Sequence, residues 1–228
     1  MPLHLRLATQ ADISGMARVG VAAFDQDTLC QALFPPHLRP VDKPDLDERL
    51  PFRKARIAER MNKPGSYSIV VVDDSLPPDD QVVGYAQWDG PQLSPVTEEE
   101  KEAAKRQQEE ARSRYPRSFS LEAFDQLYAV MVAEEKRIFG ERGCKDTWYC
   151  AVLCTDPAHA RRGIGRMLLQ WGISQATSEG RDVYLLATPA GILLYEKAGF
   201  EDVGRWNLFG SEHASMLLRY RPLHSQGT

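Results

Sequence analysis

The sequence predicts one α/β domain, built from a mixed β-sheet with helices on both of its faces. Three observations support this fold class. The 228 residues are enough for one large domain with a buried core. β-rich runs alternate with helical patterns along the chain. The last third reads as a strand, a helix and a second strand, which is the pattern of a β-α-β unit with a parallel crossover.

The first third of the chain predicts a strand, two helices and a hairpin. Leucine at every second position of residues 3–7 is typical of a half-buried strand. A helix is expected from about Thr9 to Gly20, with Thr9 as its N-cap. Residues 35–51 hold five prolines and should form an irregular loop. The remaining elements predicted here are a helix over 52–61 and a hairpin of strands 67–73 and 82–88.

The middle third predicts a helical insertion at about residues 91–146 of a single domain that spans residues 1–228. A highly charged run covers residues 97–114, and its composition favours a solvated helix over a binding element. A second helix is expected over residues 118–139.

The last third predicts a strand over residues 147–154, followed by a helix from Gly163 to Glu179. Ile164 and Leu168 belong to the apolar stripe of this helix, and Gly180 is placed to end it. The further elements predicted are a strand over 183–187, a short helix over 190–198, and two closing strands near 200–209 and 213–220.

Composition limits the classes of function. The chain is 43% hydrophobic and 26% charged, which is typical of a soluble globular protein. A net charge of −4 disfavours nucleic acid as the main partner. No signal peptide or membrane-spanning run is evident, so we expect a cytoplasmic protein without a membrane partner. Four cysteines without histidines at ligand spacing predict neither a disulfide framework nor a metal site.

The turn before the helix at Gly163 has the features of a phosphate cradle. Gly163 and Gly165 stand at the beginning of this helix, where several backbone N–H groups lack helical partners. Arg161, Arg162 and Arg166 add positive charge at the rim. A glycine pair alone is equally compatible with a tight turn. The segment also lacks the lysine of a P-loop and the third glycine of a dinucleotide fingerprint.

Two segments, one following the other along the chain, resemble motifs of the Gcn5-related N-acetyltransferase (GNAT) superfamily. Residues 153–169, which contain Arg161-Arg-Gly-Ile-Gly-Arg166, resemble its acetyl-CoA-binding motif, and Tyr195-Glu-Lys-Ala-Gly-Phe200 resembles its second signature. The resemblance covers about residues 147–210 strongly. It implies a GNAT-type, partly splayed sheet, acetyl-CoA as cosubstrate and no metal.

The resemblance also implies roles for individual residues. Tyr195 matches the tyrosine that protonates the departing CoA thiolate, although a core aromatic is the alternative from spacing alone. The cofactor-binding residues implied by the match are Leu153, Cys154, Thr155, Arg161, Arg162, Gly163, Ile164, Gly165 and Arg166. Ala160 and Thr188 depart from the family pattern, and the strand before Tyr195 lacks the glutamate base of several relatives. Asp89 is our first candidate for the general base, followed by His213 and Glu98.

These expectations combine into direct transfer of an acetyl group from acetyl-CoA to a primary amine, in a small molecule or a peptide, within a ternary complex. The alternative is a non-catalytic acyl-CoA-binding module of the same fold, because the usual glutamate base is missing. A nucleotide-phosphate enzyme is disfavoured. The identity of the amine stays open at this point, and so does a homodimer.

Overall fold

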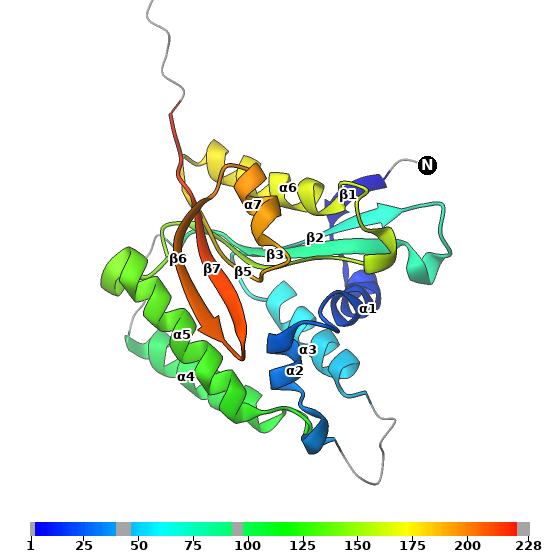
Figure 1. Cartoon of the computed structure of the whole chain (residues 1–228), viewed down its shortest axis with the longest axis horizontal. Helices are drawn as coiled ribbons and strands as arrows, with labels where there is room; N and C mark the ends of the chain where they lie inside the picture. The colour runs from blue at the N-terminus through cyan, green and yellow to red at the C-terminus, as the bar shows by residue number, and fades with distance from the viewer. Residues whose placement is uncertain (1–2, 40–46, 93–97, 223–228) are drawn as a thin grey trace, which may run out of the picture.

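The structure, a computed structural model, describes residues 3–39, 47–92 and 98–222 (Figure 1). Within these residues seven strands form one sheet in the order β1-β2-β3-β4-β5-β7-β6. The strands are β1 (Leu3–Leu7), β2 (Ser66–Asp73), β3 (Val82–Asp89), β4 (Trp148–Thr155), β5 (Val183–Ala187), β6 (Glu201–Leu208) and β7 (Ser211–Leu218).

The sheet is mixed because a single strand pair, β4 with β5, runs parallel among the described strands. The helix α6 (Ile164–Ser178) connects these two strands, as a parallel crossover requires. The predicted fold class is therefore confirmed. The hairpin of β2 and β3 is confirmed as well, with Ile69 opposite Ala86.

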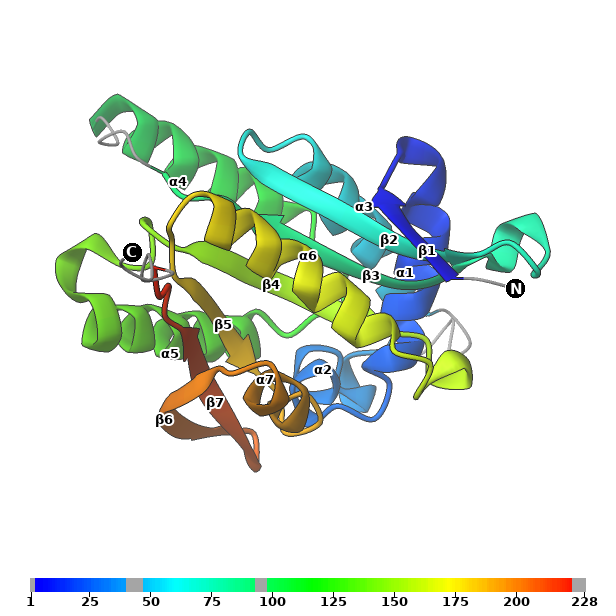
Figure 2. The ribbon, with the colours of Figure 1, turned by 90° about the horizontal axis from the view of Figure 1, so that it is seen from above.

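Helices cover both faces of the sheet (Figures 1 and 2). One face packs against α6 and α7 (Ile192–Lys197) and contains a core of fully buried side chains such as Trp88 and Leu168. The opposite face packs against α1 (Ile13–Ala23) and α3 (Arg49–Met61), where Met16 and Tyr85 are buried. The sheet thus separates two hydrophobic cores. A gap between two of its strands would therefore be reached from both faces of the sheet.

Two predictions for the first third were incomplete. The helix α2 (Thr28–Leu33) was not predicted, and Asp27 caps it by accepting a hydrogen bond from the Cys30 N–H at 3.1 Å. The helix α3 begins at Arg49, inside the segment expected to be an irregular loop. Pro51 lies in its first turn, where a missing N–H is not needed. Residues 40–46 of the expected loop lie outside the described residues.

The segment between β3 and β4 contains two helices, α4 (Glu98–Ser113) and α5 (Leu121–Phe139). An aromatic cluster joins them to α2 and α3: Phe52 contacts Phe34, Tyr115 and Phe119, with ring centroids 5.0–5.4 Å apart. The side chain of Ser215 in β7 also donates to Glu134 of α5 at 2.8 Å. These contacts hold α3 at a fixed place beneath the sheet.

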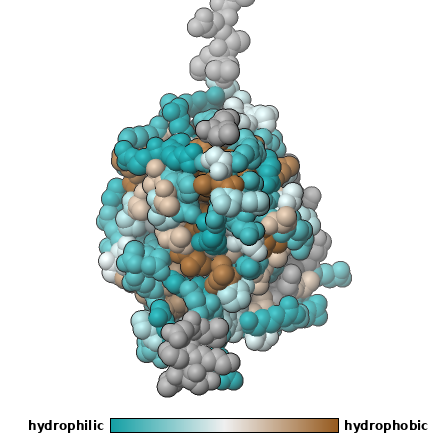
Figure 3. Space-filling model, turned by 90° about the vertical axis from the view of Figure 1, so that its right-hand side faces the viewer, coloured by the Kyte–Doolittle hydropathy of each residue, from teal (hydrophilic) through white to brown (hydrophobic). Residues whose placement is uncertain are grey.

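None of the helices in the described part of the chain has the length and apolar character that crossing a bilayer needs. On the face seen in Figure 3, hydrophobic residues form small separate patches among hydrophilic ones.

Candidate active site

The sheet opens between β4 and β5. The two strands pair over three residues, and the last pair is Cys150 with Leu185. There β4 bulges, because Val152 lies opposite Gln87 while Cys150 lies opposite Trp88, so Ala151 is the extra residue. Beyond the bulge, none of the described strands pairs with the edge of β4 that faces β5. Its free N–H and C=O groups could pair with an extended ligand.

The predicted phosphate cradle lies at the open end of β4. Gly163 adopts a left-handed conformation with φ of 82° as the N-cap of α6, and Arg161 has φ of 66°. The first N–H with a helical acceptor is that of Met167, which donates to the Gly163 carbonyl at 3.0 Å. The preceding N–H groups therefore point out of the helix end, where the helix dipole favours an anion.

Residues predicted to bind one cofactor converge at this end. A Cβ placed on Gly165 would lie 3.8 Å from Leu153, 3.7 Å from the Thr155 hydroxyl and 3.3 Å from Leu194. The end of β4, the beginning of α6 and the helix α7 thus meet around one glycine. Leu194 precedes Tyr195 in α7, so the two predicted motifs are neighbours in space.

The loop that carries the cradle is anchored by two ion pairs. Asp156 accepts from Arg18 of α1 at 2.9 Å and from the Ala158 N–H at 2.9 Å. Arg162 pairs with Asp73 of β2 at 2.7 Å. The guanidinium of Arg162 is therefore engaged with the β2–β3 hairpin, while the exposed Arg161 and Arg166 provide the rim charge.

Tyr195 is 7% exposed and lies close to the bulge of β4. Burial raises the pKa of its hydroxyl, and the neighbouring thiols of Cys150 and Cys154 add to this shift. Burial also raises the pKa of Cys154 to about 12, and it raises that of Cys150. All three groups therefore stay protonated at neutral pH.

The structure does not bring Asp89 together with Tyr195. Asp89 ends β3 opposite Tyr149, on the face covered by α3. Its carboxylate pairs with Arg60 at 2.6 Å and Lys63 at 3.0 Å, and it accepts a hydrogen bond from Ser66. Tyr195 belongs to the core on the opposite face.

His213, the second candidate base, is 2% exposed in β7. Its ring stacks on Trp206 with centroids 4.5 Å apart, and its Nδ1 lies 3.2 Å from the Ser211 carbonyl. This packing favours a structural role. For Glu98, the third candidate, the structure gives only its position as the first residue of α4.

A cavity that the sequence did not reveal lies on the α1 and α3 face. It has a volume of about 210 Å³ and includes Thr188, the residue that follows β5. It is therefore next to the opening of the sheet. Aromatic and aliphatic side chains form half of its wall, and the charged lining residues are Asp27, Arg49, Arg53 and Arg56. Its residues come from separate helices, so no sequence motif marks it.

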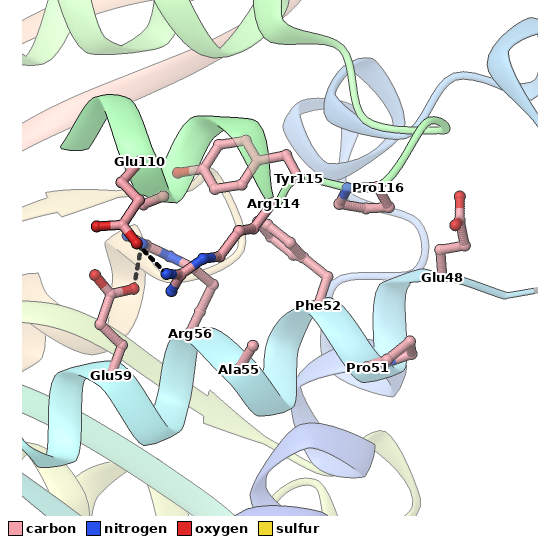
Figure 4. Close-up of a pocket in the computed structure, with 11 residues that line it drawn as sticks. Glu48, Pro51, Phe52, Ala55, Arg56, Glu59, Glu110, Arg114, Tyr115 and Pro116 are labelled. Carbon is pink, nitrogen blue, oxygen red and sulfur yellow. Dashed lines mark hydrogen bonds and ion pairs between the residues drawn. The ribbon is translucent and has the colours of Figure 1, made fainter. Parts of the chain in front are cut away.

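A larger cavity of about 540 Å³ lies on the other side of α3, against the end of α4 (Figure 4). Four of its five charged side chains form two ion pairs, Arg56 with Glu59 at 2.6 Å and Arg114 with Glu110, and the fifth, Glu48, accepts a hydrogen bond from Ser118. Among the described residues, no cluster of three or more His, Cys, Asp or Glu side chains could hold a metal ion.

Comparison with known proteins assigns the class. A family model described as an acetyltransferase (GNAT) domain matches residues 126–202, which include α6, β5 and α7. An acetyltransferase from Stachybotrys chartarum (strain CBS 109288 / IBT 7711) is 25% identical over 204 residues, covering 90% of this chain and 83% of that protein. A probable acyltransferase, SID5, from Ajellomyces capsulatus is 40% identical over 48 residues, covering 21% of this chain and 35% of that protein.

Solved structures share the whole fold. The polyamine N-acetyltransferase of Drosophila melanogaster has a TM-score of 0.62 at 11% identity, covering 96% of this chain and 100% of that one. A structure described as histone acetyltransferase HPA2 and related acetyltransferase from Corynebacterium glutamicum ATCC 13032 has a TM-score of 0.58 at 20% identity, covering 98% and 99%. Residues 126–202 therefore match a GNAT acetyltransferase domain, and the chain shares its fold with acetyltransferases of known structure.

The anchor of the cradle predicts a pH-dependent contribution to stability. Hydrogen bonds from Ser75 and the ion pair with Arg162 lower the pKa of Asp73 to about 2. A carboxylate with a lowered pKa in the folded state stabilises the protein above its unfolded pKa of about 4, and this contribution is lost as the pH falls toward 2. Asp73→Asn should therefore lower the free energy of unfolding at pH 6, and the difference from wild type should shrink between about pH 4 and pH 2.

Urea unfolding across this pH range measures the effect. Asp79→Asn, which changes an exposed carboxylate of the same hairpin, is the control and should leave the curve close to wild type. A difference between Asp73→Asn and wild type that stays constant down to pH 2 would contradict the assignment.

Proposed function

We propose that this chain transfers the acetyl group of acetyl-CoA directly to a primary amine in a ternary complex. One observation carries the proposal: the opening between β4 and β5 has an anion-binding helix end at one side and the protonated Tyr195 at the other. Two neighbours of the same fold support an amine as acceptor. One is named for a polyamine, and the other is the mosquito arylalkylamine N-acetyltransferase-like 5b, with a TM-score of 0.59 at 13% identity, covering 95% of this chain and 99% of that one.

Acetyl-CoA fits the polar groups along this opening. The pyrophosphate would bind the N–H groups at the beginning of α6, between Arg161 and Arg166. The pantetheine amides would pair with the free edge of β4 at Leu153, Cys154 and Thr155, as an added strand does. The thioester would then lie near the bulge, within reach of Tyr195.

The cradle can be tested by one change of charge. Gly163 is left-handed, and nothing lies within 4 Å of a Cβ placed there. Asparagine and aspartate both tolerate this conformation and have the same shape. Gly163→Asp should therefore fold but lose the rise in melting temperature that acetyl-CoA causes, because a carboxylate repels the pyrophosphate.

Gly163→Asn is the matched control and should keep most of the shift. Thermal denaturation with and without acetyl-CoA measures both variants. A folded Gly163→Asp protein with the wild-type shift would place the pyrophosphate elsewhere.

The proposed chemistry needs no covalent enzyme intermediate. The amine nitrogen attacks the thioester carbonyl and forms the carbon–nitrogen bond of a tetrahedral intermediate, and the carbon–sulfur bond breaks when this intermediate collapses. N–H groups of β4 beyond the bulge stabilise the oxyanion of the tetrahedral intermediate. Tyr195 gives its proton to the departing thiolate, and its raised pKa keeps it in the acid form needed for this step. The amine proton passes to a base.

Removing the hydroxyl of Tyr195 should slow acetyl transfer. Tyr195→Phe is expected to lower kcat by about 10²-fold or more, the scale of general-acid catalysis, while acetyl-CoA still raises the melting temperature. Cys154→Ala should keep most activity, because burial keeps this thiol protonated. Initial rates against both substrates should give intersecting lines. Parallel lines with an acetyl group trapped on Cys154 would indicate a covalent relay instead.

The proton of the amine needs an acceptor near the cavity by Thr188. Asp27 is the one carboxylate among the described residues that line this cavity. One of its oxygens binds the Cys30 N–H, which holds the side chain in place. Asp89 remains the prediction from sequence, but its ion pairs with Arg60 and Lys63 would have to break first. We therefore favour Asp27 as the base.

Two variants separate these candidates. Asp27→Asn should lower kcat/KM by about 10²-fold, the smaller end of general-base effects, with the deficit largest below neutral pH, where more of the amine is protonated. Asp89→Asn should leave kcat/KM within about threefold of wild type, because Asp89 does not accept the amine proton in the proposed mechanism. Initial rates at amine concentrations well below KM, measured by thiol release from pH 6 to pH 9 with saturating acetyl-CoA, give kcat/KM for each variant. A larger loss of kcat/KM in Asp89→Asn than in Asp27→Asn would instead assign the role of general base to Asp89.

A further inference from the structure

Arg53 is the unmatched cation of the cavity beside Thr188. Three arginines line this cavity, and two of them have carboxylate partners. Arg49 pairs with Asp25 and Asp47, both at 2.8 Å, and Arg56 pairs with Glu59 at 2.6 Å. Arg53 has no carboxylate partner among the described residues. Its one hydrogen bond there goes to the Tyr85 hydroxyl at 3.3 Å.

The position of Arg53 is fixed by its surroundings. Its guanidinium carbon lies 5.2 Å from the centroid of the Phe24 ring. Its side chain lies against α1 at Gly20, where a Cβ would come within 2.6 Å of the arginine Cδ. The guanidinium stays charged at every physiological pH. A half-buried cation held beside apolar groups gains most from an anion that binds next to it.

The rest of the wall describes the ligand that would bring this anion. Phe24, Phe34 and Phe52 give the cavity an apolar character, and Asp27 gives it one carboxylate. The volume of about 210 Å³ is below the roughly 300–1,000 Å³ of most ligand pockets, so only a ligand smaller than a typical drug fits inside. An ammonium group would bind near Asp27, a carboxylate would bind Arg53, and an apolar side chain would contact the aromatic rings.

We propose that the acetyl acceptor is an amino acid with an apolar side chain, whose carboxylate is bound by Arg53. This inference rests on the proposed function, since it names the acceptor class for the same reaction. A guanidinium binds a carboxylate through two parallel hydrogen bonds, which neither a neutral amide nor an ester can replace. Arg53 would thus select amines that carry a carboxylate over those that lack it.

The test compares amines that differ only in the carboxylate. The pairs are L-phenylalanine with phenethylamine and L-leucine with isopentylamine, and thiol release gives kcat/KM. Wild type should prefer at least one amino acid over its decarboxylated partner by about 10- to 100-fold, the range of a charge-assisted hydrogen-bonded pair. Arg53→Met should reduce this ratio to within about threefold of unity, and Arg53→Lys should keep part of it.

Lys54→Met is the matched control. It removes one positive charge from the next position of α3. Lys54 lines a different cavity, which Asp12 and Gln81 also line. It should keep the wild-type ratio. If Arg53→Met does not fold, the wild-type ratio and Arg53→Lys still decide the question. Equal rates for both members of each pair in wild type, or an unchanged ratio in a folded Arg53→Met protein, would overturn the proposal.

A binding experiment separates this proposal from the proposed function. The probe is 3-phenylpropionate, which has the carboxylate and ring of phenylalanine but no amine to acetylate. In the presence of CoA it should raise the melting temperature of wild type and Lys54→Met, but not of Arg53→Met. Arg53-dependent binding without transfer to any amine would reject the proposed function and keep the carboxylate site. The absence of both binding and amino-acid transfer would overturn the site itself.

Discussion

The separation of β4 from β5 is the constraint on which the site depends. Parallel pairing ends at Cys150 and Leu185, and the bulge at Ala151 turns the following residues of β4. From that point, β5 pairs with β7 through Leu186 and Ala187 on one edge only. Unpaired backbone groups inside a protein are costly unless something satisfies them. A ligand that presents amides along this edge would satisfy them, which supports the break in the sheet as the proposed binding site for the cofactor arm.

The acceptor cavity depends on contacts that lie far apart in the sequence. Phe52 of α3 lines this cavity, and its ring also packs on Phe119 of the segment between β3 and β4. The same α3 presents Arg53 to Tyr85 of β3. The helical pair α4 and α5 therefore affects the proposed acceptor site indirectly, by fixing the helix that forms a wall of the cavity. A change in this pair would alter the size of the cavity without touching the cofactor.

Local patterns point to the proposed cofactor half of the site, whereas only tertiary contacts bring together the residues of the proposed acceptor half. Gly163 and Gly165 lie within one short turn, so their spacing is visible in the sequence, and Tyr195 follows in a second motif. Arg53, Asp27 and Thr188 come from three separate elements, and no periodicity relates them. Asp89 was chosen because it ends a strand, but sequence cannot show that Arg60 and Lys63 would bind it. The helix α2 was missed because six residues give too short a pattern.

The two faces of the sheet are compatible with the proposed binding of both substrates at once. The cradle and Tyr195 belong to the face of α6 and α7, while the acceptor cavity belongs to the face of α1 and α3. Cys154 lies where these faces meet. It packs with Tyr85 in the core of one face, and its thiol contributes to the raised pKa of Tyr195 on the other. A relay through this thiol would need the thiolate, and burial disfavours the thiolate at neutral pH. In the proposed mechanism two ligands approach from opposite faces and need no such relay, because the amine would reach the thioester through the opening while CoA stays bound.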